Sequence, residues 1–191
     1  MTSGLEPQLR ALLDKQEIRE VILRYARGID RLDWGLVASC FTDDGEVDAS
    51  WFVQDAQQVY EARRLGTDTA HLGTWAELSS HYVANCLIEV DADAARSETY
   101  CIAFHRTRRP NAEIPVPIDD PDDVGRDGAE RDITLGLRYV DRFERRDGAW
   151  RIRHRAFLWD WSRVDAVTGR WTIDGGNYRR GRRDREDLAY G

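Results

Sequence analysis

Lysine and cysteine are both scarce in this 191-residue chain, and each scarcity argues against a class of chemistry. Lys15 is the only lysine and falls early on a polar helical stretch, so Schiff-base catalysis, which needs a desolvated lysine, is not expected. The three cysteines are odd in number and share no close spacing. They therefore indicate neither a disulfide framework nor a cysteine-rich zinc site, and we expect all three to be buried packing residues.

The chain also lacks a basic excess and a long apolar run. Its net charge is −7 at pH 7, whereas nucleic acids and anionic membranes are bound by strongly basic surfaces. No apolar stretch reaches the roughly 18 residues of a membrane helix, and residues 1–8 lack the cationic and apolar regions of a signal peptide. We therefore expect a cytoplasmic protein with no nucleic-acid or membrane partner and with a neutral or apolar ligand.

The composition that remains is that of a soluble domain with one hydrophobic core, with 41% apolar and 33% charged residues. Apolar residues recur at three- and four-residue steps over residues 6–29, which predicts a long amphipathic helix. A shorter helix is expected over residues 34–40. The sequence at 42–45 predicts a turn, which is followed by a short strand at 46–50 and a third helix over 54–65.

The second half of the chain has the pattern of strands. Residues 79–90 and 94–108 are joined by a short polar link, and residues 131–146 and 149–161 by an Asp-Gly turn. Two consecutive hairpins predict a curved antiparallel sheet. Between them, residues 109–130 are rich in proline, glycine and acids, so we expect an exposed excursion that can act as a lid.

No regular element is predicted after Trp161. We expect residues 1–162 to form one α+β domain and residues 163–191 to form an arm that covers the pocket or a neighbouring subunit. The reason is that a free tail seldom carries as many large apolar side chains as this one, which has Trp171, Ile173 and Tyr178. The alternative is a disordered terminus.

Several short motifs carry a resemblance to a known family. Lys15-Gln16-Glu17-Ile18 leads to Tyr25-Ala26-Arg27-Gly28-Ile29-Asp30 on the first helix, Ser80-His81 begins a strand, and residues 143–150 span the last turn. In this order, over roughly residues 9–162, the chain resembles the SnoaL-like branch of the nuclear transport factor two-like superfamily. The resemblance implies a cone-shaped α+β barrel, in which a curved antiparallel sheet wraps around N-terminal helices. This fold carries many functions, so the residues of its interior must decide the reaction.

Asp30 and His81 form the candidate acid–base pair. The resemblance places Asp30 where scytalone dehydratase and hexachlorocyclohexane dehydrochlorinase have an aspartate that contacts the catalytic histidine, and His81 at the matching strand position. A carboxylate that accepts from one imidazole nitrogen fixes the tautomer and makes the other nitrogen a better base. The alternative is that Asp30 caps a turn and that His81 is a satisfied core or surface histidine.

Tyr25 and His105 are candidates for assisting the leaving group. The resemblance places His105 close to the second histidine of scytalone dehydratase, and Tyr25 on the helix that carries Asp30. If strand alternation directs Phe104 and its even-numbered neighbours inward, however, His105 faces outward. Tyr25 stands where the dehydrochlorinase has a lysine, which argues against chloride elimination and favours a dehydratase-like reaction.

Arg155 is the third candidate for this role. Its spacing from the last turn matches that of an arginine near the carboxylate in the dehydrochlorinase. An arginine there can pair with Asp30 or stabilise a leaving anion. The alternative is a solvated cation on a strand that also carries Arg151 and Arg153.

Aromatic side chains are numerous, and five of them are candidates for lining a pocket for a flat or alicyclic substrate, with simple packing as the alternative for each. They are Trp51, Tyr82, Phe104, Tyr139 and Trp159. No cluster of histidines and carboxylates has metal-ligand spacing, and there is no glycine-rich phosphate loop. We therefore expect neither a metal nor a cofactor.

The sequence and the resemblance together predict a cofactor-free lyase, dehydratase-like, acting on a cyclic or aromatic small molecule. His81, oriented by Asp30, is expected to remove a proton from carbon, after which a small leaving group departs. A ketosteroid-isomerase-like isomerase is one alternative. The other is a non-catalytic protein, either a ligand-binding module or the small subunit of a ring-hydroxylating dioxygenase. The resemblance also implies a homodimer or homotrimer.

Overall fold

The computed structural model describes residues 5–50, 53–65, 72–107, 130–167 and 181–191. Three parts of the chain discussed above lie outside these ranges: Trp51, nearly all of the predicted excursion at 109–130, and Trp171, Ile173 and Tyr178 of the predicted arm. Within the described part, no helix is both long and apolar enough to cross a membrane.

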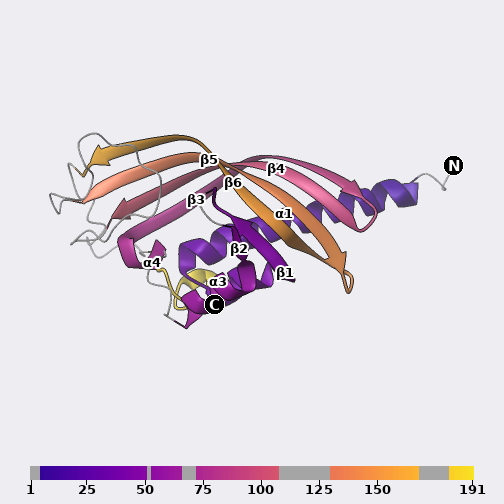
Figure 1. The fold of residues 1–191 in the computed structure, drawn as a ribbon, viewed down its shortest axis with the longest axis horizontal. Helices are drawn as coiled ribbons and strands as arrows, with labels where there is room; N and C mark the ends of the chain where they lie inside the picture. Colours follow the sequence, from indigo (N-terminus) through magenta and orange to yellow (C-terminus); the bar gives the residue numbers. More distant parts are fainter. Residues whose placement is uncertain (1–4, 51–52, 66–71, 108–129, 168–180) are drawn as a thin grey trace.

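Helix α1 (Leu5–Arg31) runs along the concave side of the sheet, which arches over it (Figure 1). Its core-facing side chains begin at Asp14 and include Ile18, Ile22 and Tyr25. The predicted helix is confirmed, but Leu9 and its apolar neighbours in the first turns are exposed rather than buried. The first turns extend past the hairpin ends of the sheet in Figure 1, so they have no sheet face to pack against.

The end of α1 is built by a Schellman motif, which places Asp30 in the last helical turn. Leu32 takes a left-handed conformation with φ of 55°, and its N–H donates to the Ile29 carbonyl at 3.3 Å. The Asp33 N–H donates to the Gly28 carbonyl at 2.9 Å. Helix α2 (Trp34–Ser39) follows directly and packs tightly on this turn, because a Cβ at Gly28 would lie only 2.6 Å from Cγ2 of Val37.

Six strands form one curved sheet in the order β2-β1-β6-β5-β4-β3. Their bounds are β1 Phe41–Asp48, β2 Val53–Asp55, β3 Ala76–Asp91, β4 Ala94–Thr107, β5 Arg131–Arg146 and β6 Ala149–Ala166; helix α3 (Ala56–Arg64) follows β2 and the short helix α4 (Leu72–Trp75) leads into β3. The expected α+β fold with a curved sheet around N-terminal helices is confirmed. The sheet is mixed rather than wholly antiparallel, since β1 runs parallel to β6, and among the described residues its edges β2 and β3 do not meet to close a barrel.

Two sequence-based predictions about local structure need correction. The predicted turn at 42–45 lies inside β1, where pairing with β6 shifts register between Phe41 and Glu46. Phe41 pairs with Ile152 and Glu46 with His154, so residues 42–45 lie opposite the single residue Arg153 and form an irregularity within the strand rather than a turn before it. Strand β6 also continues beyond Trp161 to Ala166, because residues 131–135 at the start of β5 pair with residues 162–166.

The last eleven residues, 181–191, are called the C-terminal segment below. They pack against the C-terminal end of α1 and include a short 3-10 helix, η1 (Leu188–Tyr190). Nη2 of Arg27 donates to the Ala189 carbonyl at 2.6 Å, and the Tyr190 hydroxyl donates to Asp33 at 3.2 Å. These contacts attach the end of the chain to the turn that carries Asp30.

Candidate active site

Asp30 and His81 meet on the inner side of the sheet, although 51 positions separate them in the chain. Oδ1 of Asp30 lies 2.7 Å from Nδ1 of His81, and Oδ2 accepts the His81 backbone N–H at 2.9 Å. Both side chains are largely buried, with 14% of Asp30 and 9% of His81 exposed. The end of α1 and the inward positions of β3 therefore form the pair that the sequence predicted.

Ser79 completes the surroundings of the Asp30 carboxylate by donating from Oγ to Oδ1 at 2.9 Å. Burial raises the pKa of Asp30, but the hydrogen bonds and charge of His81, together with the Ser79 hydrogen bond, lower it further, and the net shift is downward. An ionised Asp30 requires Nδ1 of His81 to be the donor. Nε2 is then the proton-accepting nitrogen, and no hydrogen bond to it is found in the described part of the chain.

His105 lies beside this pair. Its ring makes edge-to-face contacts with His81 at 5.4 Å and with Trp75 at 5.2 Å, and the side chain is buried. Of the two possible directions of alternation in β4, the structure has the one that places His105 inside. The odd-numbered residues face inward, whereas Tyr100 and Ile102 are each 45% exposed. Within the described residues, no hydrogen bond is made by its buried Nδ1.

Burial lowers the pKa of His105 well below the usual value, and the positive charge available on neighbouring His81 acts in the same direction. His105 is therefore neutral at pH values where an exposed histidine is largely protonated. A neutral imidazole can both accept and donate a proton, which suits a relay between carbon and a leaving group.

Arg155 is fully buried, but its partner is Asp141 rather than Asp30. Nε and Nη2 donate to the two carboxylate oxygens at 2.8 and 2.7 Å, in the bidentate geometry that arginine favours. The guanidinium lies between two aromatic rings, 4.0 Å from the centroid of Tyr25 and 4.2 Å from that of Tyr139. The predicted pairing with Asp30 is therefore not what the structure shows, and neither is the alternative of a solvated cation.

An irregularity in β6 aims Arg155 inward. Ile152 pairs with Phe143, but His154 pairs with Arg142, so Arg153 is an extra residue in the ladder. If β6 alternated regularly through this point, Arg155 would point outward, as the odd-numbered residues before Arg153 do. The insertion places Arg155 directly opposite Asp141 on the inner face.

Tyr25 belongs to the same cluster as Arg155. Its hydroxyl lies 3.2 Å from that of Tyr60, whose pKa is raised well above the usual value by burial. We call Tyr25, Tyr60, Tyr139, Asp141 and Arg155 the arginine cluster. Cys101 lies within electrostatic reach of both Arg155 and Asp30, and burial raises its pKa to about 11. The arginine cluster and the Asp30–His81 pair therefore both lie near this buried thiol, in the same interior.

The five aromatic candidates for lining the pocket are distributed unevenly. Tyr139 is buried and Trp159 half-buried, and Phe157 contacts both rings. Tyr82 is 62% exposed on the outer face, one position after the inward His81. Phe104 has the outward direction too, because β4 pairs without irregularity and His105 points inward. Trp51 lies outside the described residues.

Two residues that contact the candidates were missed by the sequence analysis, and each had a weak signal. Ser79 precedes His81 by two positions and so shares its strand face. Asp141 lies about as far before the Asp-Gly turn as Arg155 lies after it, which is a cross-strand charge pair. Across the described ranges, no group of three or more histidine, cysteine or carboxylate side chains is arranged to hold a metal ion.

Comparison with known proteins agrees with this architecture. A type 2 hexachlorocyclohexane dehydrochlorinase superposes with a TM-score of 0.67 at 18% identity, over 87% of this chain and 99% of that one. A putative scytalone dehydratase from Novosphingobium aromaticivorans superposes with a TM-score of 0.58 at 20% identity, over 84% and 96% of the two chains. A putative aromatic ring hydroxylase from the same organism gives 0.59 at 19% identity, over 82% and 94%.

These identities are low enough that the three structures establish the fold alone, and they differ in the activities named for them. No curated protein matches the chain. The family model described as the SnoaL-like domain matches residues 10–156, which includes Asp30, His81, His105 and Arg155. This protein therefore belongs to the SnoaL-like domain family, with the nuclear transport factor two-like fold.

Proposed function

We propose that the protein is a cofactor-independent lyase, dehydratase-like, that acts on a cyclic or aromatic small molecule. One observation carries the proposal: the 2.7 Å contact between Oδ1 of Asp30 and Nδ1 of His81, which leaves Nε2 of a largely buried imidazole to act as a base. Nε2 takes a proton from a carbon next to a carbonyl or an activated ring carbon. The C–H electrons form the new double bond, and the bond to the leaving oxygen breaks.

His105 is the group that we assign to the leaving oxygen. Its ring centroid is 5.4 Å from that of His81, it is buried, and its neutral form can relay a proton. The proton that His81 takes from carbon passes through His105 to the departing oxygen, so water leaves and both imidazoles end neutral. The side-chain hydrogen bonds of Tyr25 and Arg155 are made with other members of the arginine cluster instead. In this assignment the arginine cluster is an electrically neutral ion pair, and its contribution is a donor: Nη1 of Arg155 is buried and makes no hydrogen bond within the described residues, so it is the group that we assign to an enolate-like oxygen.

Two features support a substrate with rings. The inner face carries Tyr139, Trp159 and Trp75 near the polar groups. The dehydrochlorinase and the putative scytalone dehydratase are named for eliminations, and their likeness in fold makes the same reaction class a reasonable first assay for this chain. The cytoplasmic location expected from the sequence stays a prediction.

The test is product analysis on a panel of cyclic β-hydroxy ketones and hydroxylated aromatic precursors. We expect one product whose mass is lower than that of its substrate by one water, and a primary isotope effect when the abstracted hydrogen is replaced by deuterium. A product of unchanged mass would establish the isomerase alternative instead. Saturable binding with no product from any panel member would favour the ligand-binding alternative, including a role beside an oxygenase chain.

We also propose that the chain assembles as a homodimer or homotrimer through the outer face of the sheet. Large apolar side chains are exposed there on four neighbouring strands, namely Tyr82, Tyr100, Ile102, Val140, Leu158 and Trp161. Sedimentation equilibrium is expected to show a dimer or trimer, and Ile102→Glu on β4 to shift the mass toward the monomer. A wild-type chain that sediments as a monomer at micromolar concentration would contradict this assembly.

A further inference from the structure

Arg183 connects the end of the chain to the two elements that carry the Asp30–His81 pair. Its Nε donates to the backbone carbonyl of Asp30 at 3.2 Å, and its Nη1 donates to the carbonyl of Ala76 at 2.7 Å. Asp30 is in the last turn of α1, where carbonyls lack helical partners, and Ala76 is the first residue of β3. One guanidinium therefore bridges the helix that carries the carboxylate and the strand that carries the imidazole.

We propose that Arg183 is a positioning residue that holds α1 and β3 at the separation required by the Asp30–His81 hydrogen bond. Its expected effect on turnover rests on the proposed function, whereas its effect on the geometry of the pair does not. One residue that Arg183 contacts is Asp30 itself. The other is Ala76, the first residue of the strand that carries Ser79 and His81.

The C-terminal segment fixes the direction of Arg183. Asp187 is buried and accepts backbone N–H groups from Arg182 and Ala189, which closes the chain into a compact turn around Arg183. Arg31, at the end of α1, pairs with the same carboxylate at 3.5 Å. These contacts hold the backbone around Arg183 against the end of α1. The Arg183 side chain is therefore directed toward the carbonyls of Asp30 and Ala76.

The charge of Arg183 is also felt inside the site. It acts on His105 in the same direction as burial and as the charge of His81, lowering the pKa of that imidazole. Residue 183 lies beyond the part of the chain that matches the SnoaL-like domain, residues 10–156. The proposed positioning residue therefore lies outside the matched family domain.

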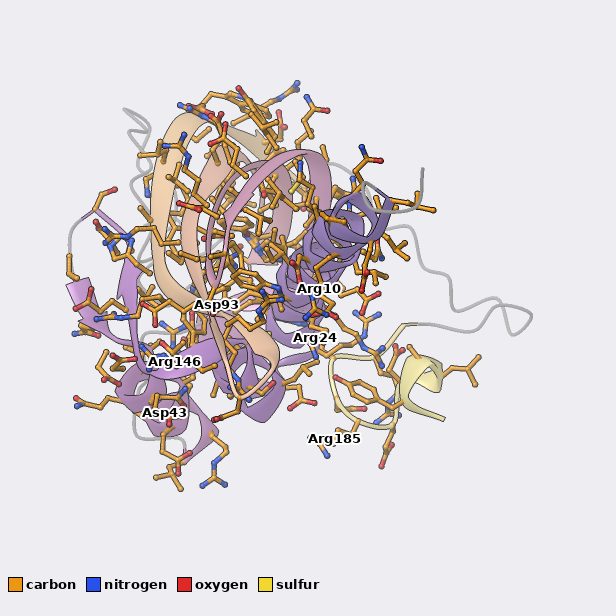
Figure 2. All side chains as sticks on the ribbon, turned by 90° about the vertical axis from the view of Figure 1, so that its right-hand side faces the viewer. Arg10, Arg24, Asp43, Asp93, Arg146 and Arg185 are labelled. Carbon is orange, nitrogen blue, oxygen red and sulfur yellow. The ribbon has the colours of Figure 1, made fainter. Side chains whose placement is uncertain are left out.

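The test compares Arg183→Ala with Arg185→Ala, a matched variant in the same segment. Arg185 is 77% exposed, and within the described ranges its side chain bonds only to that of Asp33. Figure 2 shows it at the outer margin of the molecule. The chain has only four histidines, so NMR can follow the Nδ1 proton of His81 and the titration of His105 individually. Both readouts report geometry and charge without a substrate.

For folded Arg183→Ala we expect faster exchange of the His81 Nδ1 proton with water, a higher pKa for His105 and, with a substrate, a kcat lower by roughly 10- to 100-fold with KM little changed. Arg185→Ala is expected to match the wild type in all three. Arg183→Lys keeps the charge without the planar fork that reaches two carbonyls, so it should restore the His105 pKa but only part of the proton's protection. This variant also serves if the alanine variant does not fold.

Each outcome separates the two proposals. A folded Arg183→Ala, or Arg183→Lys in its place, with wild-type exchange at His81 overturns the positioning role, and so does an Arg185→Ala variant that shows the same changes. If the NMR changes occur as expected while no panel substrate is turned over by the wild type, the proposed lyase function fails and the positioning role stands.

Discussion

Replacing His81 with glutamine is expected to lower kcat/KM for the elimination by about 100- to 10,000-fold, the usual contribution of a positioned acid–base group. The glutamine amide can still donate a hydrogen bond to the Asp30 carboxylate, which accepts at 2.7 Å in the wild type, but it cannot take a proton from carbon. The loss should therefore appear in kcat, with KM changed little, when initial rates are measured across substrate concentration.

Asp30→Asn, alone and combined with His81→Gln, tests whether Asp30 and His81 act together. An asparagine removes the charge that assigns the Nδ1 donor, so we expect a large loss here too, and no further loss when both residues are replaced. His154→Gln is the matched control. His154 is a half-buried histidine on β6, and its side chain makes no hydrogen bond within the described residues. A His81→Gln variant that keeps half of the wild-type rate would remove His81 from the mechanism.

The sequence predicted most of what positions Asp30 and His81, and the reasons are local. The helical spacing of apolar residues predicts which face of α1 is inward from Ile18 onward. Along β3, alternation holds only between the two register shifts, where it places Ser79 and His81 on the same face. What joined the two residues in advance was the resemblance to a known family, because nothing in either segment specifies a contact across 51 positions.

Arg155 shows where such reasoning stops. Its inward direction depends on one extra residue in β6, and an irregularity in a ladder is decided by pairing with two neighbouring strands rather than by local composition. The residues expected to form a turn at 42–45 likewise form an irregularity of β1, opposite Arg153 of β6. Arg183 had no signal in the sequence at all, since an arginine in a charged run is usually solvated.

Asp141→Asn is expected to lower the free energy of unfolding by about 3–5 kcal/mol, because it leaves the Arg155 guanidinium buried without its counter-charge. Both side chains of this pair are fully buried, and two hydrogen bonds of 2.7 and 2.8 Å join them. Burial lowers the pKa of Arg155, whereas the charge and hydrogen bonds of Asp141 raise it, and the net shift in the wild type is upward. A guanidinium is not deprotonated in proteins, so deprotonation does not relieve the loss of its partner. Urea unfolding followed by circular dichroism measures the change.

Two further variants show whether burial is the cause. The Arg96–Glu89 pair has the same chemistry on the exposed β3–β4 hairpin, so Glu89→Gln should change the free energy of unfolding by no more than about 1 kcal/mol. Replacing both buried partners, Asp141→Leu with Arg155→Met, removes the desolvated charges together and should recover most of the stability that Asp141→Asn loses. If Asp141→Asn costs no more than Glu89→Gln, water reaches Arg155 and its guanidinium is not a desolvated interior donor. If stability returns in the double variant while elimination does not, the buried pair is kept for the guanidinium donor that it offers to the substrate.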